Sequence, residues 1–279
     1  MMYRNIMLGS LKETFTLLWK NKVLFLLLFI LQIIFFSFFS FITLNYQTKI
    51  LENSKAIADY INKQKLDEIS IAQNILQQKN ILGDDPLSIS RNFTYIKNNF
   101  RLYLIYTFIL LVFFMSASWA ITNRIIHKSG FRKSAKYFFR IFIVLLIYLG
   151  LIFSFFFSLL NISFADVAID STEFFIKYIV FFLVSMVLIY FMFVSISLLN
   201  NTELKELIQK TLVIGIRKVN YIISVYIINI FLFAAAAFLL LYFIDENLLV
   251  LFLSLLLMIF SFVFGRLFMM NVVGKLNKD

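Results

Sequence analysis

The 279 residues are too apolar for a water-soluble globule, since 62% are hydrophobic and only 15% are charged, against roughly 45–50% and 25% in soluble domains. The net charge of +11 lies mostly in short segments beside apolar runs, where membrane topology accounts for it without a nucleic-acid partner. With no cysteine and one histidine, the chain excludes disulfides, thiolate ligands and a His-ligated redox centre, and we expect no metal and no cofactor. Seven glycines and one proline against 37 phenylalanines predict long helices. The expected fold is therefore an all-α polytopic membrane protein.

Residues 1–22 are predicted to form a helix in the membrane interface. Four apolar residues share one face of it, while the charged residues point elsewhere, and a tryptophan beside lysine is typical of interfacial segments. The residues on that face are Leu11, Phe15, Leu18 and Trp19. The alternative is that this segment is simply the inner start of the first spanning helix. The apolar run 23–44 is too long for a cleavable signal and predicts a retained span.

Residues 45–101 form the one long connection, and their periodicity predicts an external helical hairpin between the first two spans. Residues recur at coiled-coil-like spacing in the segment before the break at Gly83–Pro86, and the second arm is expected to begin at about Pro86. The residues at that spacing are Ile50, Ile57 and Ile61, and then Leu66, Ile69, Gln73 and Leu76. Asp85 and Pro86 are placed as an N-cap and first helical residue, so the second arm is expected to run into the span at 102–123. We expect the hairpin to cap the outer mouth of the bundle; a partner-docking arm is the alternative.

A basic bridge joins the second span to the third and sets the topology. Segment 124–140 contains six lysine and arginine side chains and no acid, the composition of a cytoplasmic connection. These bases are Arg124, Lys128, Arg132, Lys133, Lys136 and Arg140. Each is expected to gain about 1 kcal/mol near anionic headgroups, and the same loop is a possible docking place for a protein partner.

Four further spans follow from the apolar runs, giving six in all. They are 141–160, 174–199, 221–243 and 248–270. The two short outer turns contain acids and almost no bases, whereas 200–220 is basic. The bias predicts a plasma-membrane protein with both termini in the cytoplasm.

Three inner segments share a pattern, because each is a basic amphipathic stretch that leads into an odd-numbered span. They are Leu11–Lys22, Phe131–Arg140 and Leu204–Lys218. The pattern is typical of three repeats of a surface helix plus a transmembrane hairpin, although selection for positive inner loops alone produces the same likeness. An amphipathic segment ending in LWKNK and continuing into LFLLLFIL resembles the opening of several uncharacterised prokaryotic six-span families. Those families are similar to the membrane domain of some glycerophosphodiester phosphodiesterases. The resemblance implies the fold and membrane residence, and it transfers no active-site residue.

Polar chemistry inside the spans is sparse. We expect no ionisable residue near the middle of any span, with Arg266 at the inner end of the sixth, which argues against a proton-driven pump and an intramembrane protease. Gln32 and Asn229 are neutral and lie at matching depths, ten residues after Lys22 and eleven after Lys218. They are predicted to hydrogen-bond across the bundle centre and fix helix register.

Small residues spaced by four predict close helix packing in two spans. They are Gly150, Ser154 and Ser158 in the third span, and Ser261 and Gly265 in the sixth. A sterol or isoprenoid groove is the alternative use of such faces.

No residue set supports catalysis, so the leading hypothesis is a non-enzymatic membrane protein: a scaffold, a lipid-handling factor or an accessory subunit. The alternative is the permease subunit of an ABC-type exporter, whose basic inner loops would dock a separate ATPase. The chain itself has no phosphate-binding glycine loop.

Overall fold

The computed structural model describes residues 2–64, 87–160, 171–200, 202–243 and 248–277. Within these ranges the protein is all-α, with eight helices, as expected from the near absence of helix breakers. They are α1 (Met2–Lys20), α2 (Lys22–Gln64), α4 (Ser88–His127), α5 (Phe131–Leu159), α7 (Ser171–Leu198), α8 (Leu204–Arg217), α9 (Val219–Tyr242) and α10 (Leu248–Leu276). Six of them, all except α1 and α8, are long and apolar enough to cross a bilayer, which confirms the predicted six spans.

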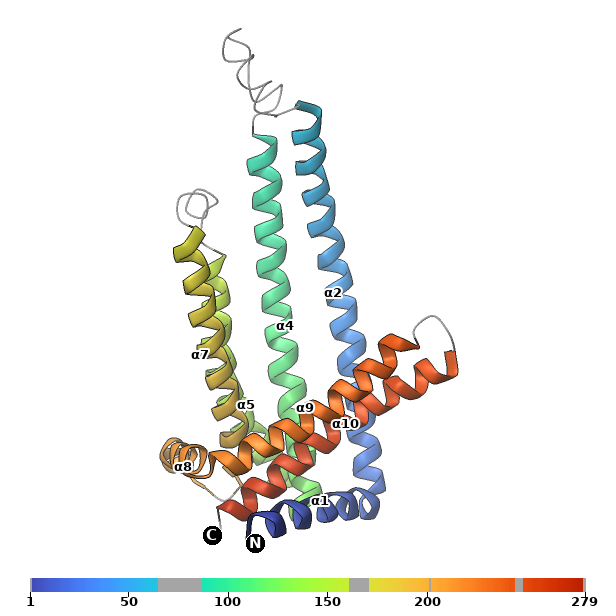
Figure 1. Cartoon of the computed structure of the whole chain (residues 1–279), viewed down its shortest axis with the longest axis vertical. Coiled ribbons are helices and arrows are strands. Elements are labelled where there is room, and N and C mark those ends of the chain that lie inside the picture. The colour runs from blue at the N-terminus through green and yellow to red at the C-terminus, as the bar shows by residue number, and fades with distance from the viewer. Residues whose placement is uncertain (1, 65–86, 161–170, 201, 244–247, 278–279) are drawn as a thin grey trace.

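The helices α2 and α4 form a long antiparallel pair that rises above the rest of the bundle (Figure 1). At 1.5 Å per residue, the 43 residues of α2 give a rod of about 65 Å, roughly twice a bilayer core of about 30 Å. The first predicted hairpin arm is therefore a continuation of span one, with Ile50 and Ile57 half-buried and Ile61 exposed. The second arm continues into span two as expected, with Leu87 as the N-cap of α4. Asp85, Pro86 and the set from Leu66 to Leu76 lie outside the described residues.

The C-terminal helix α10 is the centre of the bundle. It packs against α1, α2, α4, α7 and α9, and nearly every residue from Ile259 to Val273 is buried. It also continues to Leu276, beyond the end predicted at 270. Sequence pattern did not distinguish α10 from the other spans, because a helix surrounded by helices and a helix surrounded by lipid are both apolar on every side.

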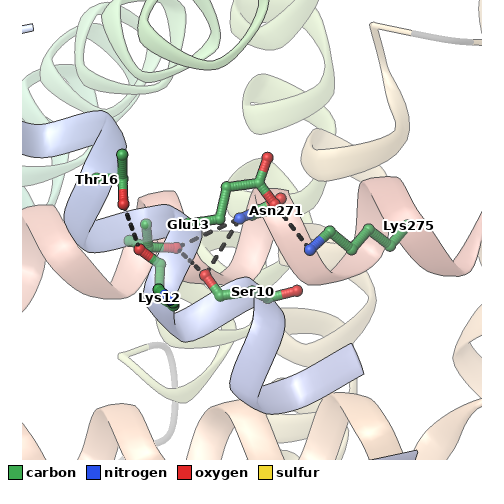
Figure 2. A network of polar contacts seen from close by, with 7 residues as sticks. Ser10, Lys12, Glu13, Thr16, Asn271 and Lys275 are labelled. Carbon is green, nitrogen blue, oxygen red and sulfur yellow. Dashed lines mark hydrogen bonds and ion pairs between the residues drawn. The ribbon is translucent and has the colours of Figure 1, made fainter. Parts of the chain in front are cut away.

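Helix α1 lies across the end of the bundle (Figure 1), and it is bonded to the last turns of α10 (Figure 2). The Asn271 Nδ2 donates to the Ser10 carbonyl at 3.2 Å and lies 3.5 Å from the Thr14 Oγ1. Beside it, Lys275 Nζ pairs with Glu13 Oε2 at 2.7 Å. Because α1 and α10 come from opposite ends of the chain, these contacts close the fold.

The predicted apolar face of α1 is divided in the structure. Leu18 is buried against the bundle, whereas Trp19 is 76% exposed and Phe15 is 53% exposed. Adjacent residues are about 100° apart on a helix, so Leu18 and Trp19 point to different sides of α1. The bundle-facing side is instead partly polar, and it consists of Met7, Ser10, Thr14 and Leu18.

Helix α8 also lies at this end of the molecule, together with both termini (Figure 1). Its close contact with α7 depends on Gly215, since a Cβ there would lie 2.7 Å from a ring carbon of Phe191. The Tyr190 hydroxyl donates to the Gly215 carbonyl at 2.7 Å. The repeat predicted from the sequence is thus uneven: α1 and α8 are separate helices, but Phe131–Arg140 begins α5 without a break.

Candidate functional site

The basic bridge divides into side chains that are free to meet a surface and side chains held by the fold. Arg140 is half-buried and donates to the carbonyl of Thr202, beyond the end of α7. Arg124 is also half-buried, in the last turn of α4. Four of the six predicted contact residues are exposed: Lys128, Arg132, Lys133 and Lys136. The connection between α4 and α5 lies at the end of the molecule that carries α1 and α8 (Figure 1).

The predicted packing face of α5 does not contact another described helix. Ser154 and Ser158 are exposed, and nothing lies within 4 Å of a Cβ built at Gly150. The Ser154 hydroxyl instead donates to the Gly150 carbonyl in its own helix, at 2.7 Å. A serine hydroxyl can make its hydrogen bond to a carbonyl of its own helix in this way. Small residues at four-residue spacing therefore do not by themselves establish a contact with another helix.

The small residues of α10, by contrast, lie where α9 approaches. A Cβ at Gly265 would lie 3.1–3.3 Å from the side chain of Asn229. The Asn229 Nδ2 donates to the Gly265 carbonyl at 3.3 Å, and Ser261 Oγ lies 3.4 Å from the Leu232 carbonyl. Gly265 therefore makes room for an amide that bonds directly to the backbone of the neighbouring helix.

The next residue of α10, Arg266, lies farther inside its helix than expected, since α10 ends at Leu276 and not at 270. Arg266 Nη1 donates to Gln32 Oε1 at 3.1 Å, and Gln32 is only 5% exposed. Gln32 lies ten residues into α2, which is about 15 Å along the helix and half the thickness of the bilayer core. The guanidinium of Arg266 therefore points into the bundle, from a residue that lies ten positions before the end of α10 at Leu276.

Gln32 and Asn229 do not bond to each other. Each bonds to α10 instead, at the consecutive residues Arg266 and Gly265. The two neutral amides that the sequence marked at matching depths thus converge on one turn of the central helix.

A cavity of about 280 Å³ lies beside this turn. Its inner wall is aromatic, with the Trp119 and Phe193 rings 5.9 Å apart and Phe193 6.3 Å from Tyr226. Its rim includes Ile230, which is 63% exposed, and the facing rings of Phe233 and Phe262, each 37% exposed. The cavity therefore opens to the outside of the bundle, beside α9 and α10. Most of its lining is apolar with a few polar groups, as is typical of ligand pockets.

Three residues that line this cavity have a buried polar atom without a hydrogen-bond partner in the part of the chain that the structure describes. Among the described residues, Arg266 Nε and Nη2, Trp119 Nε1 and Asn229 Oδ1 are buried and make no hydrogen bond, and all three residues line the cavity. A buried polar group without a partner costs about 1–3 kcal/mol, and more when it is charged. We name the cavity with these atoms the Arg266 pocket.

Sequence reasoning missed the Arg266 pocket because α4, α7, α9 and α10 all contribute to its walls. One signal was present. An arginine inside the 29-residue apolar helix α10 is expensive in a membrane and marks a functional position by default.

The described residues contain no group of three His, Cys, Asp or Glu side chains placed to hold a metal ion. Asp166 and Asp170, which the sequence put on an outer turn, lie outside the described ranges, as does the side chain of Glu173. No protein-family model, curated protein or solved structure matches the chain. What identifies it is its architecture: six long apolar helices make it a multi-pass membrane protein in contact with the lipid bilayer.

Proposed function

We propose that this chain is a non-enzymatic lipid-handling protein of the plasma membrane, which takes an apolar chain from the bilayer into the Arg266 pocket. The observation that carries this proposal is the position of the opening. Ile230, Phe233 and Phe262 at the rim are exposed, and the exposed surface of a spanning helix faces lipid tails. The pocket is therefore entered from the hydrocarbon, the phase in which lipids are dissolved.

The exposed bases support a matching orientation. Lys128, Arg132, Lys133 and Lys136 would face the cytoplasmic leaflet, whose anionic lipids attract basic segments. Both termini would then be cytoplasmic, and the long α2–α4 extension would stand on the outer side as a cap.

Single-cysteine labelling tests this orientation directly, because the chain has no cysteine of its own. Lys55→Cys and Lys133→Cys replace exposed lysines on the α2 extension and in the basic bridge. We expect an impermeant maleimide to label Lys55→Cys in intact cells and Lys133→Cys only after permeabilisation. The reverse pattern would invert the orientation and with it the role of the basic bridge.

Lipid entry into the pocket is testable by fluorescence, because the chain has two tryptophans in opposite settings. Trp119 is 1% exposed and lines the pocket, whereas Trp19 is 76% exposed. In a Trp19→Phe variant, we expect brominated acyl chains in phosphatidylcholine nanodiscs to quench Trp119 strongly and saturably. Ser261→Leu, which fills part of the pocket, should reduce that quenching. Weak quenching of Trp119 that does not saturate would mean that only random collisions reach this buried residue. No acyl chain would then enter the pocket, and the proposal would fail.

The permease hypothesis makes a different prediction for purification. A permease subunit should retain an ATPase in mild detergent and release it when Arg132 and Lys133 are replaced. Our proposal expects the chain to purify with bound lipid instead, as identified by mass spectrometry of both proteins and lipids.

A further inference from the structure

The Arg266 pocket has a chemical preference, which is a step beyond its proposed role in lipid handling. We infer that the pocket binds a single-chain amphiphile with an oxyanion headgroup, a carboxylate or a phosphate, held by Arg266 and Trp119 with its chain passing out through the rim. This inference rests on the proposed function, because it assumes that a chain enters.

The first argument is charge. Arg266 is one residue from Gly265, where α9 and α10 meet, and its described hydrogen bond is to the neutral amide of Gln32. No aspartate or glutamate occurs in α4, α5, α9 or α10, nor in α2 between Lys22 and Leu51. The one acid of α7, Glu173, lies twenty residues before Phe193, about 30 Å along that helix. Of the described acids, Glu13 and Glu206 are paired with Lys275 and Lys210. The sequence therefore supplies no internal anion at this depth, and buried charges are normally paired.

The second argument is the kind of polar atom left open. Arg266 Nε and Nη2 and Trp119 Nε1 are all N–H donors without partners among the described residues, and both side chains line the cavity. A guanidinium presents its donors as a planar fork that matches the two oxygens of a carboxylate or phosphate. A carboxylate or phosphate has two or more oxygens and can accept from several of these donors at once, whereas a neutral alcohol has a single oxygen with two lone pairs.

The third argument is size. A cavity of about 280 Å³ is at the small end of the range of roughly 300–1,000 Å³ for small-molecule sites. It holds a headgroup and the first part of a chain, and the rest must continue past Ile230 and Phe262 into lipid. A two-chain phospholipid would not fit with its headgroup at this depth.

The test compares three amphiphiles of equal chain length: dodecanoate, dodecyl phosphate and dodecanol. Each amphiphile is titrated into the Trp19→Phe variant in phosphatidylcholine nanodiscs that contain brominated acyl chains. Displacement of a brominated chain from the pocket is measured as recovery of Trp119 fluorescence. We expect the two anions to displace the brominated chain at concentrations about tenfold lower than the alcohol does. The order of the two anions identifies whether the natural headgroup is a carboxylate or a phosphate.

Arg266→Met should remove the advantage of both anions, a loss of about tenfold, and leave dodecanol binding unchanged, which also reports that the variant is folded. Arg266→Lys should retain only part of the anions' advantage over dodecanol, because an ammonium keeps the positive charge but lacks the planar pair of donors of a guanidinium. Arg217→Met is the matched control, since Arg217 is exposed at the end of α8 and its replacement lowers the net charge by the same one unit. Equal displacement by all three amphiphiles, unaffected by Arg266→Met, would overturn the headgroup inference while leaving chain entry intact. Failure of every amphiphile to displace the brominated chain would overturn both.

Discussion

Replacing Phe268 by alanine is expected to reduce the free energy of unfolding by about 3 kcal/mol, the low end of the range for buried Phe→Ala. Phe268 is fully buried in α10, with its ring 5.9 Å from that of Phe264. The low end applies because the separated helices remain in lipid, so the loss is one of packing rather than of transfer from water.

Phe252→Ala provides the matched control, because Phe252 belongs to the same helix and is 58% exposed. Its removal should change stability by less than about 0.5 kcal/mol, as for surface substitutions in general. Unfolding of both variants in mixed micelles, followed by circular dichroism, measures the difference. Equal losses would mean that α10 is not the central helix.

The double substitution Arg266→Met with Gln32→Leu is expected to stabilise the purified, ligand-free protein by about 2 kcal/mol. An arginine held at mid-bilayer costs about 2.5–3.5 kcal/mol on the insertion scale, and a hydrogen bond in the membrane returns only about 0.6 kcal/mol. When the helices separate, the long side chain is free to turn toward the headgroups. The folded bundle therefore holds Arg266 at a net cost, as expected of a position kept for binding.

The single substitution Gln32→Leu should act in the opposite direction and reduce stability by about 1 kcal/mol, because it leaves Arg266 without its bond to Gln32. The sign change between the single and the double variant distinguishes a strained binding site from an ordinary core contact. If the double variant unfolds more easily than the wild type, the Arg266–Gln32 pair is a structural element and the cost argument is wrong.

The fold followed from the sequence to the extent that it depends on local composition. Apolar runs long enough for a bilayer and the scarcity of glycine and proline gave six spans, and the helical spacing at Ile50 and Ile57 correctly predicted the α2 extension. The length and position of each helix are determined by its own segment of the sequence. The packing of the helices against one another is not, because packing in lipid depends on the shapes of the helices rather than on an apolar stripe.

The candidate site shows the same division. Gln32 and Asn229 stood out in the sequence as isolated amides in apolar helices, and both contact the turn of α10 that borders the pocket. That turn was not evident from the sequence, because Arg266 was counted among the inner bases on the assumption that its helix ended nearby. Trp119 was unremarkable in sequence, and its significance comes from an unpartnered Nε1 that only the assembled bundle reveals.

The bond between α1 and α10 has a consequence for how the protein is made. Ser10 and Asn271 are 261 positions apart, and synthesis at about 5–20 residues per second leaves an interval of roughly 13–50 s between them. During biogenesis α1 emerges long before the end of α10 that it contacts has been synthesised. Until then, we expect α1 to lie on the bilayer surface. Assembly is then completed only when α10 has been synthesised. A chain that ends before α10 would also lack the partner that holds α1 at the other end of the sequence.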